Sequence, residues 1–168
     1  MKKINVSTLF LMSLSFAVMS SCMRNNGEFH SEYVDLGLSS GTKWKTVNEK
    51  NSADVQYGFF TFYEAFDTFG DKLPDINQWT ELVNECSWIW TGMGYKVTGP
   101  NGKSITLPAS GGRNCDDNVD GVGFEGYYWS YTASSPDSAW GPYFDSKEVT
   151  LENGLTCSSL SVRLVQQK

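Results

Sequence analysis

The most specific chemical pattern in this 168-residue chain is an acidic loop near its middle. Asp116, Asn118 and Asp120, followed by Gly121, match the first half of a calcium-binding loop, whose alternating oxygen ligands converge on a hard cation. The bidentate acid that such a loop needs at its twelfth position is missing, because that place is Tyr127. Two interpretations stay open, a weak Ca²⁺ site and a plain acidic turn, and the missing ligand favours the turn. No other metal site is predicted.

A second group of residues could recognise a ligand rather than react with one. Tyr131, Trp140 and Tyr143 surround a Ser- and Asp-containing segment that includes Asp137. Rigid amphipathic rings beside small polar residues make an adaptable recognition surface, because they lose little entropy on binding. These four residues are the candidate ligand-binding site. The alternative is that the rings pack in the core, which is the role expected of the nearby Trp129.

The sequence offers no convincing catalytic centre. His30 is the only histidine, and it lies beside a polar N-terminal stretch, so a Ser/His/Asp arrangement has no base in the folded part. Nineteen acidic residues allow paired carboxylates in principle, but no spacing places two of them across a cleft. We therefore predict no catalytic residue, no cofactor and no enzyme activity.

The four cysteines are Cys22, Cys86, Cys115 and Cys157. If Cys22 is modified, three remain, and three cannot all pair within one chain. Two states of these three cysteines stay open: one disulfide with one free thiol, or no disulfide. Cys115 with Cys157 is the favoured pair, because both fall in predicted loops, whereas Cys86 falls on the apolar stripe of a predicted helix.

The first 22 residues have the pattern of a bacterial export signal. Lys2 and Lys3 precede a short apolar run, and Ser20-Ser21-Cys22 resembles the lipobox of bacterial lipoproteins. In that class the chain is cut before the cysteine, and the cysteine carries the acyl chains. The expected organisation is a signal peptide over 1–21, a lipidated flexible tether over 22–31 and one domain over 32–168. The expected location is the cell envelope, anchored by lipid, at the outer membrane; whether the domain faces the surface or the periplasm stays open.

Charge restricts the partners of the mature chain. The full chain carries a formal charge of −6, and loss of Lys2 and Lys3 makes the remainder more negative. An acidic surface repels phosphate backbones, so we expect no nucleic acid partner. Membrane contact is expected through the lipid anchor alone, and the domain is expected to be a monomer.

Hydrophobic periodicity and capping signals predict a hairpin and two helices in the first half. Alternation over 33–38 and 42–47, around a Ser-Ser-Gly turn, predicts the opening hairpin. Thr61 with Glu64 forms a capping box for a helix over 62–68. Asp75 with Gln78 caps a second helix, in which Trp79, Leu82, Val83 and Cys86 share one buried stripe.

The second half reads as short strands joined by turns and loops. Strands are predicted over 95–97, 104–107, 127–132, 149–151 and 160–165. Long loops are predicted over 110–126 and 133–140, and Asn153-Gly154 is predicted to be a turn. Two short helices packed on small antiparallel sheets with long loops give an α+β fold class.

Several stretches together resemble a domain of Bacteroidetes lipoproteins, the Fibrobacter succinogenes major paralogous domain. The matching segments keep the family order and are Tyr33–Trp44, Tyr57–Phe60, Leu73-Pro74, Asn84–Trp88, Gly94–Gly102, Gly126–Ser130 and Ser161–Arg163. The resemblance implies a C-type-lectin-like fold, related to that of formylglycine-generating enzymes. The chain departs from the family at 48–51 and at Leu164, and no cysteine motif like that of those enzymes surrounds Cys157.

These observations lead to one expected function and two alternatives. The expected function is non-enzymatic binding of a glycan or protein ligand at the cell envelope. The first alternative is a structural or accessory subunit of an envelope or surface assembly. An enzyme related to formylglycine-generating enzymes is the less favoured alternative.

Overall fold

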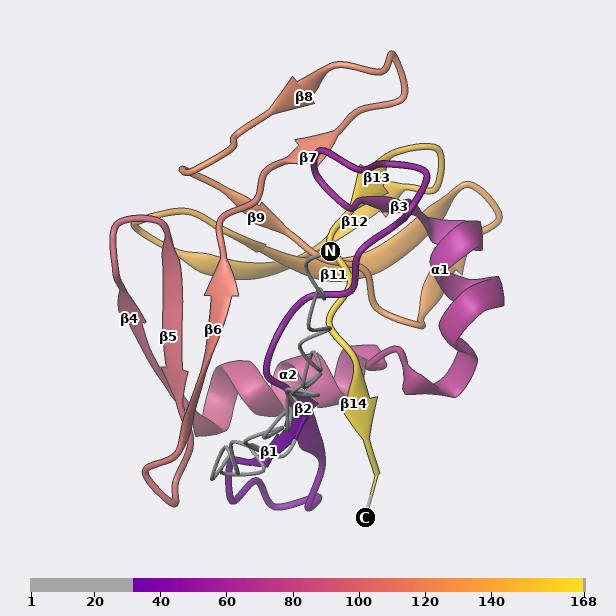
Figure 1. Ribbon diagram of the computed structural model, residues 1–168. Coiled ribbons are helices and arrows are strands. Elements are labelled where there is room, and N and C mark those ends of the chain that lie inside the picture. Colours follow the sequence, from indigo (N-terminus) through magenta and orange to yellow (C-terminus); the bar gives the residue numbers. More distant parts are fainter. Residues whose placement is uncertain (1–31, 168) are drawn as a thin grey trace, which may run out of the picture. The chain divides into compact units, whose positions relative to one another are not determined.

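The computed structural model of the protein describes residues 32–167. Within this range two α-helices and four small antiparallel sheets confirm the α+β class (Figure 1). The predicted signal peptide 1–21 and tether 22–31, with Cys22 and His30, lie outside the described residues. None of the described helices is long and apolar enough to cross a membrane.

Both helices begin where their capping boxes predict. Helix α1 spans Phe62–Phe69. The Thr61 hydroxyl accepts a hydrogen bond from the Glu64 backbone N–H, and the Glu64 carboxylate accepts one from the Thr61 backbone N–H. Helix α2 spans Ile76–Glu85 and has the same reciprocal pair between Asp75 and Gln78. Each box satisfies two backbone N–H groups that a helix start would leave unpaired. A short 3-10 turn, η1 (Gly70–Lys72), separates the two helices.

The first sheet joins the beginning and the end of the domain in the order β1–β2–β14. Its strands are β1 (Tyr33–Asp35), β2 (Lys43–Lys45) and β14 (Val165–Gln166). The opening hairpin is therefore confirmed, and the C-terminal strand pairs with its second strand. A separate sheet, in the order β4–β5–β6, contains the predicted strands around the Gly99–Gly102 turn. Its strands are β4 (Ser87–Trp90), β5 (Gly94–Thr98) and β6 (Ser104–Pro108).

The two remaining sheets form the upper half of the domain in Figure 1. One has the order β3–β13–β7–β8. Its strands are β3 (Phe60–Thr61), β7 (Gly112–Arg113), β8 (Val119–Asp120) and β13 (Ser159–Leu160). The other has the order β10–β11–β12, with β9 also paired to β11. Its strands are β9 (Gly126–Tyr127), β10 (Ala133–Ser135), β11 (Ser138–Phe144) and β12 (Val149–Leu155).

The predicted strand over 127–132 is wrong beyond its first residues. After β9, the backbone N–H groups of Trp129, Ser130 and Tyr131 donate to Ser161, Trp140 and Pro74, which belong to three different segments. The N–H groups of Tyr128 and Ser130 donate to Pro142 and Trp140 of β11, so this segment runs on beside β11 while its other N–H groups bond to separate segments instead of to a second strand. Trp129 is fully buried, as predicted, and its indole N–H donates to the Phe60 carbonyl at 2.8 Å.

Three segments predicted as loops or turns contain strands, although most of 110–126 is loop as predicted. Residues 133–140 form the β10–β11 hairpin, and 110–126 contains the β7–β8 hairpin. The predicted turn at Asn153-Gly154 is also wrong, because β12 continues through it opposite Trp140 and Ala139 of the long strand β11. Cross-strand pairing overrides the local turn preference here.

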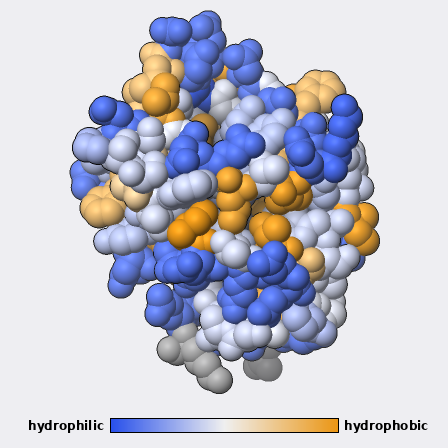
Figure 2. Space-filling view, turned by 180° about the vertical axis from the view of Figure 1, so that it is seen from behind, coloured by the Kyte–Doolittle hydropathy of each residue, from blue (hydrophilic) through white to orange (hydrophobic). Residues whose placement is uncertain are grey.

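The C-terminal segment predicted as one strand is two short strands, β13 and β14. Leu160, Val162 and Leu164, which alternate along this segment, nevertheless all pack in one apolar cluster with α1 and Trp129. A second cluster lies around Trp44, Trp79 and Phe144. Figure 2 shows that, on the face opposite to that of Figure 1, some hydrophobic residues also remain at the surface among hydrophilic ones.

Candidate functional site

The four predicted ligand-binding residues do not form one site. Trp140 and Tyr143 lie three residues apart on the regular strand β11, so their side chains point to opposite faces of the sheet. Tyr131 lies on Phe66 of α1, with ring centroids 4.9 Å apart and nearly parallel. Asp137 occupies the β10–β11 turn, where its backbone carbonyl accepts the Thr156 N–H. Of the four, Tyr143 is the residue that borders a groove.

That groove is formed by two adjoining hollows. The first has a volume of about 250 Å³ and is lined by residues of the β7–β8 hairpin, β9 and the β12–β13 connection, among them Gly112, Asn114, Tyr127, Gly154, Ser158 and Leu160. The second has a volume of about 90 Å³ and shares Tyr127, Gly154 and Leu160 with the first. It adds Tyr143, Glu152 and Asn153 to the lining. We call the two hollows together the Tyr127 groove.

Two tyrosines and one carboxylate build the wall of the groove at β9 and β11. Tyr127 and Tyr143 are directly opposite each other in the β9–β11 pair, and their ring centroids are 5.1 Å apart. The Tyr127 hydroxyl donates to Glu125 at 2.9 Å, and the Tyr143 hydroxyl donates to the other oxygen of the same carboxylate at 3.5 Å. One side chain therefore fixes both rings.

The environment of these rings is both partly buried and negative. Burial, the hydrogen bond to Glu125 and the nearby charge of Glu152 raise the pKa of Tyr127 far above its ordinary value. Burial and the charges of Glu125, Asp145 and Glu148 raise the pKa of Tyr143. Both phenols therefore stay protonated at neutral pH, as hydrogen-bond donors.

Glycines keep the groove open. A Cβ atom at Gly112 would come within 2.9 Å of Leu160 and 3.3 Å of the Tyr127 ring, so a larger residue would press on the lining. A Cβ at Gly154 would lie 3.4 Å from the Trp129 ring, an ordinary contact distance. A Cβ atom at position 154 would therefore fit the fold, at a position that lines both hollows.

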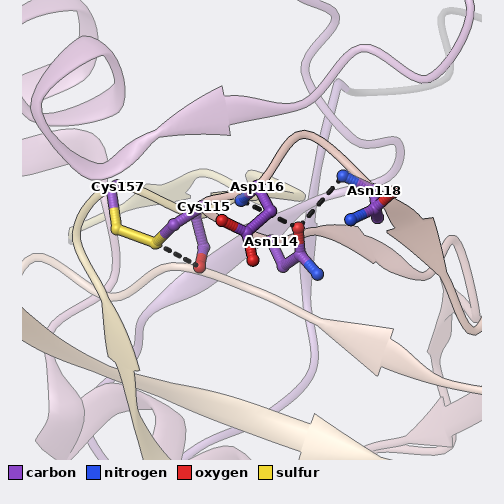
Figure 3. Close-up of a disulfide and its surroundings, with 6 residues drawn as sticks. Asn114, Cys115, Asp116, Asn118 and Cys157 are labelled. Carbon is purple, nitrogen blue, oxygen red and sulfur yellow. Dashed lines mark hydrogen bonds between the residues drawn. A yellow bond between two sulfur atoms is a disulfide. The ribbon is translucent and has the colours of Figure 1, made fainter.

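A disulfide closes the other wall. Cys115 and Cys157 are bonded, and their neighbours in the sequence, Asn114 and Ser158, both line the groove. Figure 3 shows how Asn114 orders the turn beside the disulfide: its side-chain oxygen accepts the backbone N–H groups of Asp116 and Asn118, each at 3.0 Å. The hairpin is thereby held against the β12–β13 connection.

The acidic loop is built as this hairpin turn. Asp117, not one of the three predicted calcium ligands, takes a left-handed backbone conformation with φ of 67°, and its carboxylate pairs with Arg113. Asp120 lies in β8, on the opposite arm of the hairpin from Gly112. Within residues 32–167, no group of three or more His, Cys, Asp or Glu side chains is placed to hold a metal ion.

Arg113 marks the outer end of the groove. Its guanidinium makes ion pairs with Asp117 at 2.9 Å and Asp54 at 3.3 Å, and it lies over the Tyr57 ring. A neighbouring hollow of about 300 Å³ lies between Arg113 and the start of α1. A larger hollow of about 500 Å³ is bounded by Glu32 and Gln167, the first and last described residues, and has a mainly polar lining.

The free thiol has no catalytic setting. Cys86 follows α2 and is half-buried against the apolar cluster around Trp79. Burial, with the charges of Glu85 and Glu81, raises the pKa of the Cys86 thiol to about 11. A thiolate is the nucleophilic form, and this setting disfavours it at neutral pH.

Most groove residues are not predicted as functional from the sequence. Tyr127 is predicted only as the first residue of a strand and stands where a calcium loop would need its twelfth-position acid, and no motif singles out Glu125. The signal that could have found them is the close spacing of Glu125 and Tyr127 with glycines at 121, 123 and 126, which marks a tight backbone path beside a ring.

The disulfide is consistent with an extracytoplasmic location, where such bonds form and persist. Comparison with models of known protein families, with curated proteins and with solved structures found no match to this chain.

Proposed function

We propose that this protein is a lipid-anchored cell-envelope protein that binds a ligand, without catalysis, through the Tyr127 groove. The observation that carries this proposal is the groove itself, in which fixed aromatic rings meet amide and hydroxyl groups. Pockets that bind ligands typically combine a mainly apolar lining with a few placed polar groups. The binding surface lies next to Tyr143 and away from Tyr131, Asp137 and Trp140.

The sequence supports the envelope location and the anchor. Residues 1–21 have the composition of an export signal, and acylated Cys22 followed by the tether 22–31 would hold the domain near a membrane. The disulfide between Cys115 and Cys157 supports export, because it persists in an oxidising compartment. The domain would act as a tethered receptor with no membrane insertion of its own.

The resemblance to the Fibrobacter succinogenes major paralogous domain supports a C-type-lectin-like fold for this domain. The α+β class with two short helices and small antiparallel sheets is what that resemblance implies. Non-enzymatic binding is supported by the inert setting of Cys86 and by the use of Glu125 as a hydrogen-bond acceptor for two tyrosines.

The test is retention of envelope components by the immobilised protein. Gly154→Thr should fill the groove without disturbing the strand, since threonine suits β-structure and its Cβ meets ordinary contacts. Leu155→Thr is the matched control, because Leu155 is 56% exposed on the same strand and lines neither hollow. With ligand well below saturation, we expect Gly154→Thr to lose at least nine-tenths of the retained ligand (roughly 1.4 kcal/mol in affinity), and Leu155→Thr to keep it.

Two outcomes would contradict the proposal. Equal retention by both variants would show that the groove is not the binding site. A stoichiometric protein partner retained regardless of Gly154→Thr would favour the accessory-subunit alternative. Equal urea midpoints for the two variants serve as the folding control.

A further inference from the structure

The charged groups around the Tyr127 groove are mainly acidic. Arg113 lines the first hollow, but Asp54 and Asp117 form ion pairs with it and Asp120 lines the same hollow. Glu152 lines the second hollow. These carboxylates would repel an anion, so the groove disfavours a negatively charged ligand.

The middle of the groove is apolar and rigid. Tyr127, Leu160 and Gly154 line both hollows, and the Tyr127 ring cannot swing freely because its hydroxyl is bound to Glu125. The face of an aromatic ring carries partial negative charge, and it attracts polarised C–H groups as well as excluding water from them. This part of the groove suits a flat apolar face of a ligand.

Unused hydrogen-bonding groups surround this apolar strip. Within residues 32–167, no hydrogen bond engages the side chains of Asp120 or Asn153, and the Asn114 amide nitrogen is likewise unused. The Ser158 hydroxyl has only a long contact of 3.7 Å to the Cys115 sulfur. Polar groups with spare capacity at both walls can pair with hydroxyl or amide groups of a ligand.

We propose that the Tyr127 groove binds an uncharged sugar residue of a glycan. One apolar ring face would pack on Tyr127 and Leu160, and the ring hydroxyl groups would pair with Asn114, Asn153 and Ser158. This inference rests on the proposed function, because it names the ligand class of the same groove. The volume of about 250 Å³ lies just below the usual range for drug-sized ligands, about 300–1,000 Å³, and suits one ring-sized group.

A protein ligand fits these observations less well. A peptide side chain that fills the apolar strip would leave the polar groups on both walls to water. A lysine or arginine side chain could pair with Asp120, but it would bring its charge into the hollow that Arg113 also lines, and Glu125 is already engaged by two tyrosine hydroxyls. A sugar ring presents apolar and hydroxyl surfaces together, which is the combination that the groove presents.

The experiment is titration of the purified protein with matched trisaccharides, followed by saturation-transfer NMR and calorimetry. The neutral set is cellotriose, maltotriose, mannotriose and tri-N-acetylchitotriose; the charged set is trigalacturonic acid and chitotriose, with an oligolysine peptide beside them. We expect at least one neutral sugar to bind with a dissociation constant on the order of 1 mM, as a small ligand allows. Its affinity should not change with a roughly tenfold change in salt, because no net charge is bound.

Two variants tie this binding to the groove. Gly154→Thr should weaken binding of the neutral sugar at least tenfold, and the control Leu155→Thr should leave it unchanged. Asn153→Ala removes one unused amide from an exposed position and should weaken binding about threefold to tenfold, about 0.7–1.4 kcal/mol. Its small side-chain change keeps the test valid if Gly154→Thr fails to fold.

The outcomes separate this inference from the proposed function. Binding of charged probes alone, or of neutral sugars equally by all variants, overturns the sugar assignment. No binding of any neutral sugar at roughly ten times the expected dissociation constant also overturns it. If envelope material is then still retained in a Gly154-dependent way, the proposed binding function stands with a ligand of another class.

Discussion

Arg113 and Arg163 show two opposite ways to accommodate a guanidinium in one domain. Arg163 is fully buried and donates four hydrogen bonds, two to the Asn48 side chain and one each to the carbonyls of Lys45 and Thr106. Among residues 32–167, no carboxylate accepts a hydrogen bond from it. Arg113 lies at the surface, where Asp54 and Asp117 form ion pairs with it.

The pKa shifts of the two side chains have opposite signs because burial dominates at Arg163 and carboxylate partners dominate at Arg113. Burial lowers the pKa of Arg163, because neutral acceptors replace only part of the lost hydration. The hydrogen bond to Asp117, aided by Asp54, raises the pKa of Arg113. Arg163 joins segments that are 57 and 118 residues away from it, at Thr106 and Lys45, so it is a fixed part of the fold. Arg113 belongs to the surface that a ligand can reach.

The largest expected effect is that of Arg163→Met. Methionine fills part of the volume but leaves Asn48, Lys45 and Thr106 with buried acceptors that no longer have a donor. At about 1–3 kcal/mol for each unpaired group, less the relief of a buried charge, we expect unfolding free energy to fall by roughly 3–5 kcal/mol. Urea denaturation followed by tryptophan fluorescence measures it.

Arg163→Lys is the control for charge. A single ammonium cannot reach acceptors on three segments, so this variant should also be strongly destabilised, although it keeps the positive charge. A loss below about 1 kcal/mol for Arg163→Met would show that the network contributes little. The contrast between a structural and a surface arginine would then fail.

The second prediction concerns the covalent link on the Arg113 side. Replacing both Cys115 and Cys157 with serine opens a crosslink between residues separated by 42 positions, which should cost about 2–4 kcal/mol through the entropy of the unfolded chain. Limited proteolysis of the variant should cut first within 110–126, because the β7–β8 hairpin loses its attachment. First cleavage near Arg163 would instead place the weak point in the buried network.

The third prediction uses Tyr128, which belongs to the buried side of the comparison. Its hydroxyl donates to the Pro108 carbonyl and accepts from Asn48, and burial raises the pKa of Tyr128 to about 12, against partial opposition from the charge of Arg163. Between pH 10 and 12 the unfolded chain loses this proton while the folded chain keeps it. The contribution of Tyr128 to the free energy of unfolding is therefore fully present below pH 10. It falls as the pH rises, by up to about 3 kcal/mol.

Tyr128→Phe should be less stable at pH 8, because it lacks the hydroxyl, yet it should lose less stability between pH 10 and 12 than the wild type. Tyr127 and Tyr143 also have raised pKa values and add a decline common to both proteins. Parallel curves of unfolding free energy against pH would show that Tyr128 does not carry the difference.

How well the sequence predicts each region follows from where its hydrogen bonds go. The helices are predictable because Thr61 and Asp75 bond to residues three positions away, within the reach of a local pattern. The opening hairpin and the β5–β6 turn are local for the same reason. Trp129 is predictable as a core residue because a large apolar side chain tends to be buried whichever strands surround it.

The groove and the Arg163 network depend on distant partners that no local pattern encodes. Asn153-Gly154 has turn chemistry, yet it is strand because β11 lies beside it. Arg163 stands in a strand-like alternation, and its fully buried position is set by acceptors up to 118 residues away. Trp140 and Tyr143 are close in sequence but fall on opposite sheet faces, because the strand period of two separates residues three apart.

The smallest expected effect on stability is that of Arg113→Gln, which makes it the sharpest test of the comparison. The pair with Asp117 is open to solvent and screened, and glutamine can still donate a hydrogen bond to the less exposed Asp54, so the urea midpoint should fall far less than in Arg163→Met. Glutamine keeps hydrogen-bonding capacity but removes the positive end of the groove. Binding of a neutral trisaccharide should change less than about threefold, roughly 0.7 kcal/mol, while the cationic chitotriose should bind more tightly at low salt, because the carboxylates Glu125 and Glu152 are then unopposed. A midpoint shift as large as that of Arg163→Met would make both arginines structural and remove Arg113 from the ligand surface.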